Sequence, residues 1–125
     1  MRSYRHLPVF LAVIVTLIIV GCSGKSGSKQ LGVAAPSDVP RVTLKQVTSE
    51  PAAFDGKNVV MEGIVSGQCA SLCEFTYKEG TDAVVIFPQG FKLPKLQTGS
   101  KVRMHAQISK GEERVVISAL GLEQL

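Results

Sequence analysis

The sequence predicts an all-β fold, a small five-stranded barrel that occupies residues 41–125. Apolar and polar side chains alternate over several short stretches, as they do in strands with one buried face. Turn signals such as Asp55-Gly56 and Glu79-Gly80 separate these stretches. A glycine, Gly63, stands within the longest stretch, where a bend or bulge lets one strand serve two sides of a small barrel.

The pattern of strands and turns begins after Arg41 with three apolar residues, Val42, Leu44 and Val47. Glu50-Pro51 then opens a short loop or a single helical turn that ends at Asp55-Gly56. The first long strand is predicted over Lys57–Ser66, with apolar residues on both faces. A second, half-buried strand follows, in which Cys73, Phe75 and Tyr77 alternate with Glu74, Thr76 and Lys78.

The third strand is predicted to be buried, because Ala83–Phe87 is an unbroken apolar run. Residues 88–99 form a longer connection, in which Phe91, Leu93 and Leu96 are expected to plug the barrel. Lys101–Ser109 alternates cleanly as a fourth strand. Its inward residues are expected to be Val102, Met104, Ala106 and Ile108, and its outward residues Arg103, His105 and Gln107. The last strand is Arg114–Leu122.

Five strands with a longer connection between the third and the fourth predict an OB-type barrel, and a different small barrel or an open meander is the alternative. The stretches GKNVVMEGIVSGQC, GSKVRMHAQI and VVISALGLE resemble small bacterial single-domain OB-fold proteins, several of them envelope families of unknown function. The resemblance covers roughly residues 42–123. Those proteins often carry Gly-Cys-Trp where this chain has Leu72-Cys73-Glu74, so no role of that tryptophan is carried over. Likeness of fold does not transfer function.

Residues 1–21 are predicted to be a cleaved signal peptide. Arg2 and Arg5 precede an apolar run, Val9–Val20, which is shorter than the roughly 20 residues of a membrane-spanning helix. The run ends at Ile19-Val20-Gly21-Cys22, which resembles the lipobox of bacterial lipoproteins. The resemblance implies that Cys22 carries fatty acyl chains such as palmitate and becomes the first residue of the mature protein. An uncleaved membrane helix is the alternative.

Two or three acyl chains hold a small domain on a membrane, whereas one gives only marginal binding. The expected location is therefore the cell envelope, with the lipid as membrane anchor. Ser23, and not an aspartate, follows the cysteine. In a Gram-negative organism this resemblance to the usual sorting rule favours the periplasmic side of the outer membrane.

Residues 22–40 are predicted to be the acylated cysteine and a flexible linker, because Gly, Ser, Lys and Pro dominate and apolar residues show no periodicity. Removal of Arg2 and Arg5 with the signal leaves twelve basic against ten acidic residues, a net charge of +2. These charges are interspersed and form no basic stripe. Nucleic acid is therefore not expected as a partner.

The segment that could carry chemistry is Cys69-Ala-Ser-Leu-Cys73, because it contains two nearby thiols. Two nearby thiols outside the cytoplasm favour a structural disulfide, and a redox pair or a metal site are the alternatives. The Cys-x3-Cys spacing differs from the Cys-x2-Cys of thioredoxin-like proteins. Soft thiolates with Met61, Met104 or His105 could suit Cu(I) or Zn(II). Met104 and His105 are predicted to face opposite sides, however, and a closed zinc site needs four ligands, so no metal site is predicted.

Three aromatic residues, Phe75, Tyr77 and Phe91, are candidates for a ligand-binding face, since many OB modules stack a base or sugar on such side chains. Phe75 and Tyr77 share a face with Cys73, which favours the core for them. His105, the sole histidine after the signal, is expected to be solvated. No Ser-His-Asp or Cys-His arrangement is found, so neither an enzyme nor a cofactor is predicted.

The sequence thus predicts an envelope lipoprotein whose OB-like domain is a binding or accessory module for a small ligand or an envelope protein. Its expected binding surface is the second and third strands with the 88–99 connection. The alternative is a lipoprotein for thiol redox chemistry or metal handling that uses Cys69 and Cys73.

Overall fold

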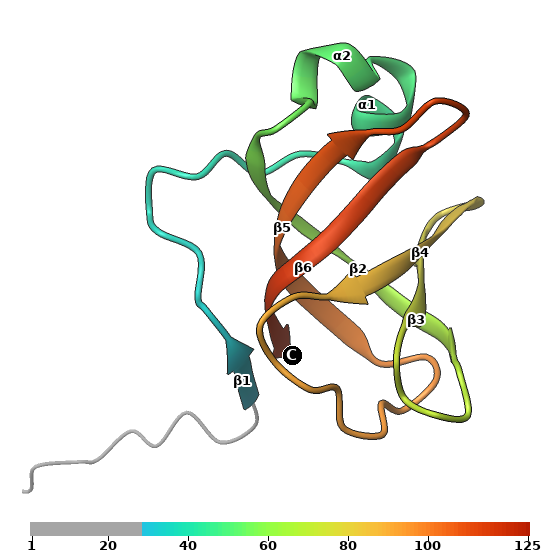
Figure 1. Cartoon of the computed structure of the whole chain (residues 1–125). Helices are drawn as coiled ribbons and strands as arrows, with labels where there is room; N and C mark the ends of the chain where they lie inside the picture. The colour runs from blue at the N-terminus through green and yellow to red at the C-terminus, as the bar shows by residue number, and fades with distance from the viewer. Residues whose placement is uncertain (1–28) are drawn as a thin grey trace, which may run out of the picture.

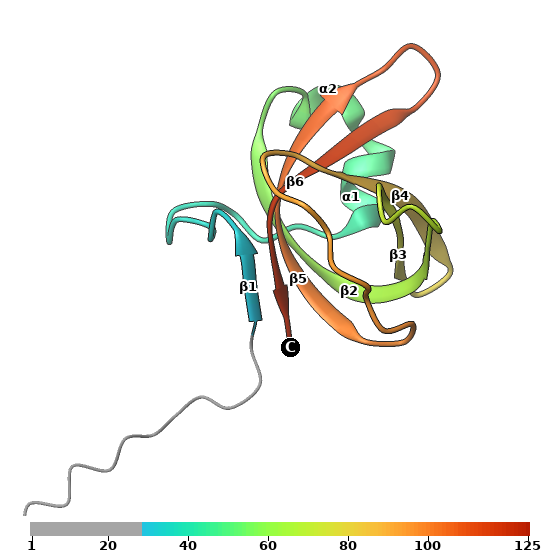
Figure 2. The ribbon, with the colours of Figure 1, turned by 60° about the horizontal axis from the view of Figure 1, so that its bottom comes forward.

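The computed structural model describes residues 29–125, and the predicted signal peptide and Cys22 lie outside this range. Five strands form a closed barrel, as the alternation predicts (Figures 1 and 2). They are β2 (Asn58–Gln68), β3 (Phe75–Glu79), β4 (Asp82–Pro88), β5 (Lys101–Lys110) and β6 (Val115–Gln124). Around the barrel the order is β2, β3, β4, β6, β5, with β5 pairing again with β2. β4 and β6 are parallel and the other neighbours antiparallel, which is the OB-type arrangement.

The strand β2 belongs to both sides of the barrel, as predicted. Its first part, Asn58–Ile64, pairs with β5, and Ile64–Gln68 pairs with β3 across a bulge. Gly63 stands at this change of partner. A Cβ atom there would lie 2.6 Å from the Lys78 carbonyl oxygen and from the Tyr77 ring, so only glycine fits.

A helix begins at Leu44, which corrects the expectation of strands and turns there, whereas the single helical turn predicted after Glu50-Pro51 is confirmed. Residues Leu44–Ser49 form helix α1, and Pro51–Phe54 form the short α2. A capping box at Thr43 and Gln46 starts α1, because each side chain accepts a hydrogen bond from the other residue's backbone N–H. Leu44 and Val47, spaced for a helix, close one end of the barrel.

Part of the predicted linker is also ordered. Lys29–Gly32 forms strand β1, which pairs antiparallel with the last residues of β6 (Figure 1). The pairing continues past the strand, since the Val33 N–H donates to the Leu120 carbonyl at 2.8 Å. The crossing is so close that a Cβ on Gly121 would lie 2.0 Å from the Val33 carbonyl oxygen. The flexible linker predicted for 22–40 is therefore wrong for Lys29–Gly32.

His105 faces away from the barrel interior, as the alternation predicts, but it is not solvated. Only 7% of the residue is exposed, because the β1 segment covers it. Its Nδ1 lies 3.2 Å from the Val33 carbonyl oxygen. The inward-facing residues of β5 were predicted correctly and are all buried in the core: Val102, Met104, Ala106 and Ile108.

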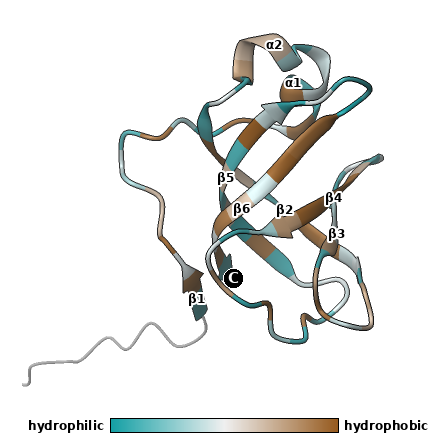
Figure 3. Ribbon diagram, in the orientation of Figure 1, coloured by the Kyte–Doolittle hydropathy of each residue, from teal (hydrophilic) through white to brown (hydrophobic). Residues whose placement is uncertain are grey.

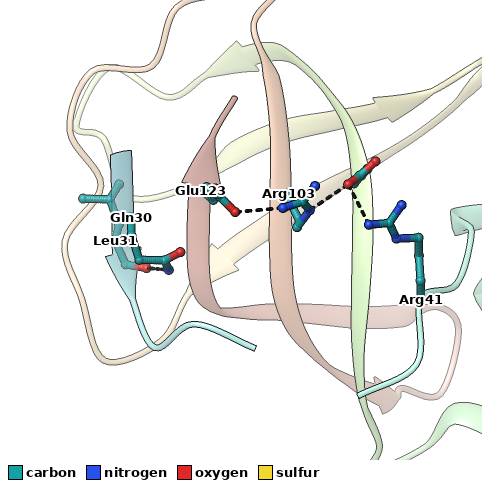
Figure 4. Close-up of polar contacts among 6 residues, drawn as sticks. Gln30, Leu31, Arg41, Arg103 and Glu123 are labelled. Carbon is teal, nitrogen blue, oxygen red and sulfur yellow. Dashed lines mark hydrogen bonds and ion pairs between the residues drawn. The ribbon is translucent and has the colours of Figure 1, made fainter. Parts of the chain in front are cut away.

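An ion-pair network crosses the outer face of the barrel over three strands (Figure 4). The Arg103 guanidinium on β5 donates to Glu62 on β2 at 2.7 Å and to Glu123 on β6 at 3.1 Å. Arg41 adds a second contact to Glu62 at 3.1 Å. The hydrogen bond from Arg103 is the main reason that the pKa of Glu62 lies below its usual range. The positive charge of Arg41 also lowers this pKa, and burial of the carboxylate opposes both effects. The network fastens β5 to both of its neighbours.

The close approach at Gly63 makes Gly63→Ala a strong test of the barrel. We expect this change to cost about 1–3 kcal/mol of unfolding free energy, because the added methyl meets backbone and a buried ring. Gly67→Ala is the matched control in the same strand, since a Cβ there would lie 3.8 Å from the nearest atom, Thr76 Oγ1. Chemical denaturation measures both. Equal effects of the two changes would contradict the close approach.

Candidate functional site

A groove lies on the outside of the barrel where β4 and β6 diverge. The two strands pair only at Ile86–Pro88 of β4 with Ile117–Ala119 of β6. Asp82–Val85 pair with β3 alone. Strand pairing therefore continues all the way around the barrel, but the first part of β4 is not paired with β6. The opening between the two strands there is a groove of about 760 Å³.

The groove is mainly apolar, and its lining comes from four elements and the residues next to them. It consists of Thr48 on α1, Glu74 and Thr76 at β3, Ala83, Val84, Val85 and Phe87 on β4, and Arg114, Val115 and Val116 at β6. Phe87 is 40% exposed and Val116 is 36% exposed. Figure 3 shows β4 as a mostly hydrophobic strand. The prediction that Ala83–Phe87 is a buried strand is therefore wrong for its outward side, and only Ile86 of this run is fully buried.

The backbone of β4 also contributes to the groove. Glu79 and Asp82 pair across the two-residue turn at Gly80, so Val84 and Ile86 are the next β4 residues that exchange hydrogen bonds with β3. The N–H groups of Ala83 and Val85 therefore point away from β3, toward the gap. The ladder with β6 begins only at Ile86 and does not reach these donors. An apolar surface thus lies beside unpaired main-chain donors.

The aromatic candidates lie elsewhere. Phe75 and Tyr77 are core residues, with 1% and 0% exposure, so the structure contradicts a ligand-face role for them. Burial, and then the nearby Glu79 carboxylate, raise the pKa of Tyr77, which keeps the phenol neutral. Phe91 is half-buried against the core, where its ring lies close to Gly32. The 88–99 connection contributes nothing to the groove.

The exposed aromatic residue of the groove is Phe87, which the sequence reasoning missed. It is the last residue of the apolar run Ala83–Phe87, which the sequence predicts to be a buried strand. Glu74 and Thr76 alternate with the core residues Phe75 and Tyr77, and this alternation is the sequence signal for the outer face of β3. The unbroken apolar run of β4 carries no such signal. The 88–99 plugs were predicted more accurately, since Leu93 and Leu96 are both buried.

The predicted cysteine pair lies in the loop between β2 and β3, next to the groove. Cys69 is half-buried and Cys73 is exposed, and the structure has both as free thiols. The Cys73 N–H donates to the Cys69 sulfur, with 3.0 Å between N and Sγ. Ser71 Oγ lies 3.4 Å from the same sulfur. Leu72 adopts a φ of 59°, a left-handed conformation that is uncommon for residues other than glycine.

These contacts stabilise a thiolate at Cys69. Hydrogen bonding from the Cys73 thiol is the largest contribution, followed by Ser71 and the backbone N–H groups of the loop, and together they lower the pKa of Cys69 to about 6. The lowered pKa favours the thiolate form of Cys69, which is the nucleophilic form of a cysteine. The disulfide between the two residues stays a prediction.

The metal alternative gains no support from the geometry. Residues 29–125 contain no cluster of three or more His, Cys, Asp or Glu side chains that could hold an ion. Met61 and Met104 are fully buried in the barrel, and the Nδ1 atom of His105 contacts the Val33 carbonyl oxygen. In the same range, none of the helices is long and apolar enough to cross a membrane.

Comparison with known proteins supports the fold and nothing beyond it. The sequence matches no family model and no curated protein. Its structure is similar to part of a crystal structure from Leishmania major Friedlin that is assigned as an aspartyl-tRNA synthetase, with a TM-score of 0.55 and 13% sequence identity. The likeness covers 75% of this chain and 22% of that protein. At this identity it shows an OB-type barrel and does not indicate activity.

The thiolate at Cys69 predicts a distinctive pH profile of alkylation. With reduced protein and iodoacetamide, the rate at Cys69 should rise with pH and reach half its maximum near pH 6, since the pKa is lowered to about 6. Cys73→Ala should move this midpoint upward, because it removes the largest contribution. Mass spectrometry of the modified peptide follows the reaction. A midpoint near 8.5, the value of an ordinary cysteine, would contradict the thiolate.

Proposed function

We propose that this chain is an envelope lipoprotein, anchored through lipid on Cys22, whose OB-type barrel is a binding module. The groove between β4 and β6 is its binding site, and the ligand is an extended segment of an envelope protein. The observation that carries the proposal is the pairing of exposed apolar side chains with unpaired N–H groups on β4. An extended peptide that adds a strand to a sheet edge uses both kinds of contact.

The position of β1 supports this arrangement. If Cys22 carries the lipid, seven residue steps separate it from Lys29, which reach about 25 Å at full extension. β1 lies on the opposite side of the barrel from β3 and β4 in both views (Figures 1 and 2). A short tether attached there holds the barrel near the membrane and leaves the groove accessible.

The charges of the groove favour a polypeptide over a nucleic acid. Arg114 and Glu74 are the charged residues of its lining, so the groove carries no excess of positive charge for a phosphate backbone. The β4 side chains that line the groove are apolar, and they offer contacts to the apolar side chains of a polypeptide. An unidentified small ligand is the alternative occupant, and photocrosslinking from within the groove distinguishes the two.

The lipid anchor predicts that the full chain incorporates labelled palmitate when it is expressed in a bacterium with lipoprotein-processing enzymes. The label should disappear in Cys22→Ser, because the thioether that carries the diacylglycerol cannot form. Cys69→Ser is the matched control and should keep the label. Palmitate incorporation that survives Cys22→Ser would refute the anchor.

The groove predicts a partner that depends on Phe87. A photoreactive phenylalanine analogue at Thr76, inside the groove, should crosslink to discrete protein bands in cells that natively produce the chain. The same analogue at Ile64, exposed on β2 outside the groove, should not give these bands. Phe87→Asp should remove most of the Thr76 products, since a charge disrupts the apolar contact. Identical bands from both positions, or no protein bands at Thr76, would reject a peptide-binding groove.

A further inference from the structure

The loop between β2 and β3 brings two thiols together in an arrangement that the binding groove does not require. Cys69 ends the β2 side of the loop, where its N–H donates to the Glu74 carbonyl at 3.2 Å. The Leu72 N–H donates to the Cys69 carbonyl at 3.0 Å, which closes a tight turn. The left-handed backbone at Leu72 then directs the Cys73 N–H toward the Cys69 sulfur. Uncommon backbone of this kind is often found at functional sites.

We propose that Cys69 and Cys73 form a thiol–disulfide exchange site, in which Cys69 attacks a substrate disulfide and Cys73 then attacks the mixed disulfide that results. This activity is separate from the proposed binding function and does not depend on it.

The geometry assigns the two roles. The Cys69 sulfur accepts a hydrogen bond from a main-chain N–H and lies beside the Ser71 hydroxyl, so its negative charge is stabilised without a metal or a basic residue. Cys69 is half-buried and still accessible. Cys73 is exposed, and its backbone nitrogen already touches the attacking sulfur, so its thiol needs little movement to reach a mixed disulfide.

The exchange balances without any further oxidant. The Cys69 thiolate attacks one sulfur of the substrate disulfide, the substrate S–S bond breaks, and one substrate thiolate leaves with the electron pair. Cys73 then loses its proton and attacks the Cys69 sulfur of the mixed disulfide, which releases the second substrate thiolate. The two protein thiols are oxidised to one disulfide, the substrate disulfide is reduced to two thiols, and the two protons from the protein pass through solvent to the leaving thiolates.

The substrate is a disulfide, either of a small molecule or of a peptide. Cys73 directly precedes Glu74, which lines the groove, so a bound peptide would lie next to the thiols. Two probes separate these sources. One is glutathione disulfide, and the other is a short extended peptide dimer joined by a single disulfide.

The test uses the full lipoprotein in detergent, reduced and freed of reductant, at pH 6. Cys73→Ser keeps a hydroxyl that can donate to Cys69 and removes the resolving thiol, so it should accumulate a stable mixed disulfide on Cys69. Cys69→Ser is the matched variant, and the double variant controls for other cysteines. Circular dichroism shows whether each variant is folded.

The wild type should end with an internal disulfide, two hydrogens lighter, without a lasting mixed disulfide. At pH 6 a thiol of pKa near 6 exceeds an ordinary cysteine about tenfold in rate, because its larger thiolate fraction outweighs its lower intrinsic nucleophilicity. Cys73→Ser should therefore react about tenfold faster than an ordinary cysteine, and also faster than Cys69→Ser, because the hydrogen bonds at the Cys69 sulfur favour its thiolate. Reaction with either probe supports the site, and the faster probe identifies the source of the disulfide.

Three results would overturn the proposal. They are equal rates in the two single variants, a mixed disulfide that persists in the wild type, and failure of both probes to react. The groove experiment with Phe87 is independent, so failure here would leave the binding proposal unaffected.

Discussion

The close approach of two strands at Gly63 is the constraint on which the barrel depends. The Tyr77 ring and the Lys78 carbonyl occupy the space that a side chain at position 63 would need. This contact lets β2 leave β5 and continue beside β3 within one strand. Among the described strands, only β2 pairs with both β3 and β5. The connection between β3 and β5 therefore depends on the absence of a side chain at position 63.

Closure at β2 has a structural consequence on the opposite side. β3 follows β2 into the barrel and β4 follows β3, but the parallel ladder between β4 and β6 spans only three residues of each strand. The remaining length of β4 has a partner on one side only. The same arrangement places the loop from Cys69 to Cys73 at the end of β3 that borders the groove. The proposed binding site and the proposed thiol site thus arise from one feature of the topology, although their chemistry is independent.

The sequence predicts the barrel well because period-two alternation and turn signals are local properties. It predicts α1 badly, since Leu44 and Val47 fit the spacing of a helix and the capping box at Thr43 was not recognised. It misses β1 because Lys29–Gly32 lacks a strand pattern, and its pairing depends on the absence of a side chain at Gly121, far away in the chain. The same limit applies to His105. The alternation predicts that its side chain faces outward, but not that the β1 segment covers it.

The groove could be predicted only in part. The outward positions of β3 follow from the alternation, but the exposure of Phe87 depends on where β6 stops pairing with β4. The low pKa of Cys69 was likewise beyond the sequence, because it arises from the fold of the loop and not from the spacing of the cysteines.

Amide hydrogen exchange, measured residue by residue with NMR, tests the open seam most directly. The account predicts that the N–H groups of Ala83 and Val85 exchange much faster than those of Val84 and Ile86, which lie on the same strand and bond to β3. Equal, strong protection of all four amides would mean that β4 and β6 are joined along their whole length. The groove, and the peptide-binding proposal that depends on it, would then be wrong.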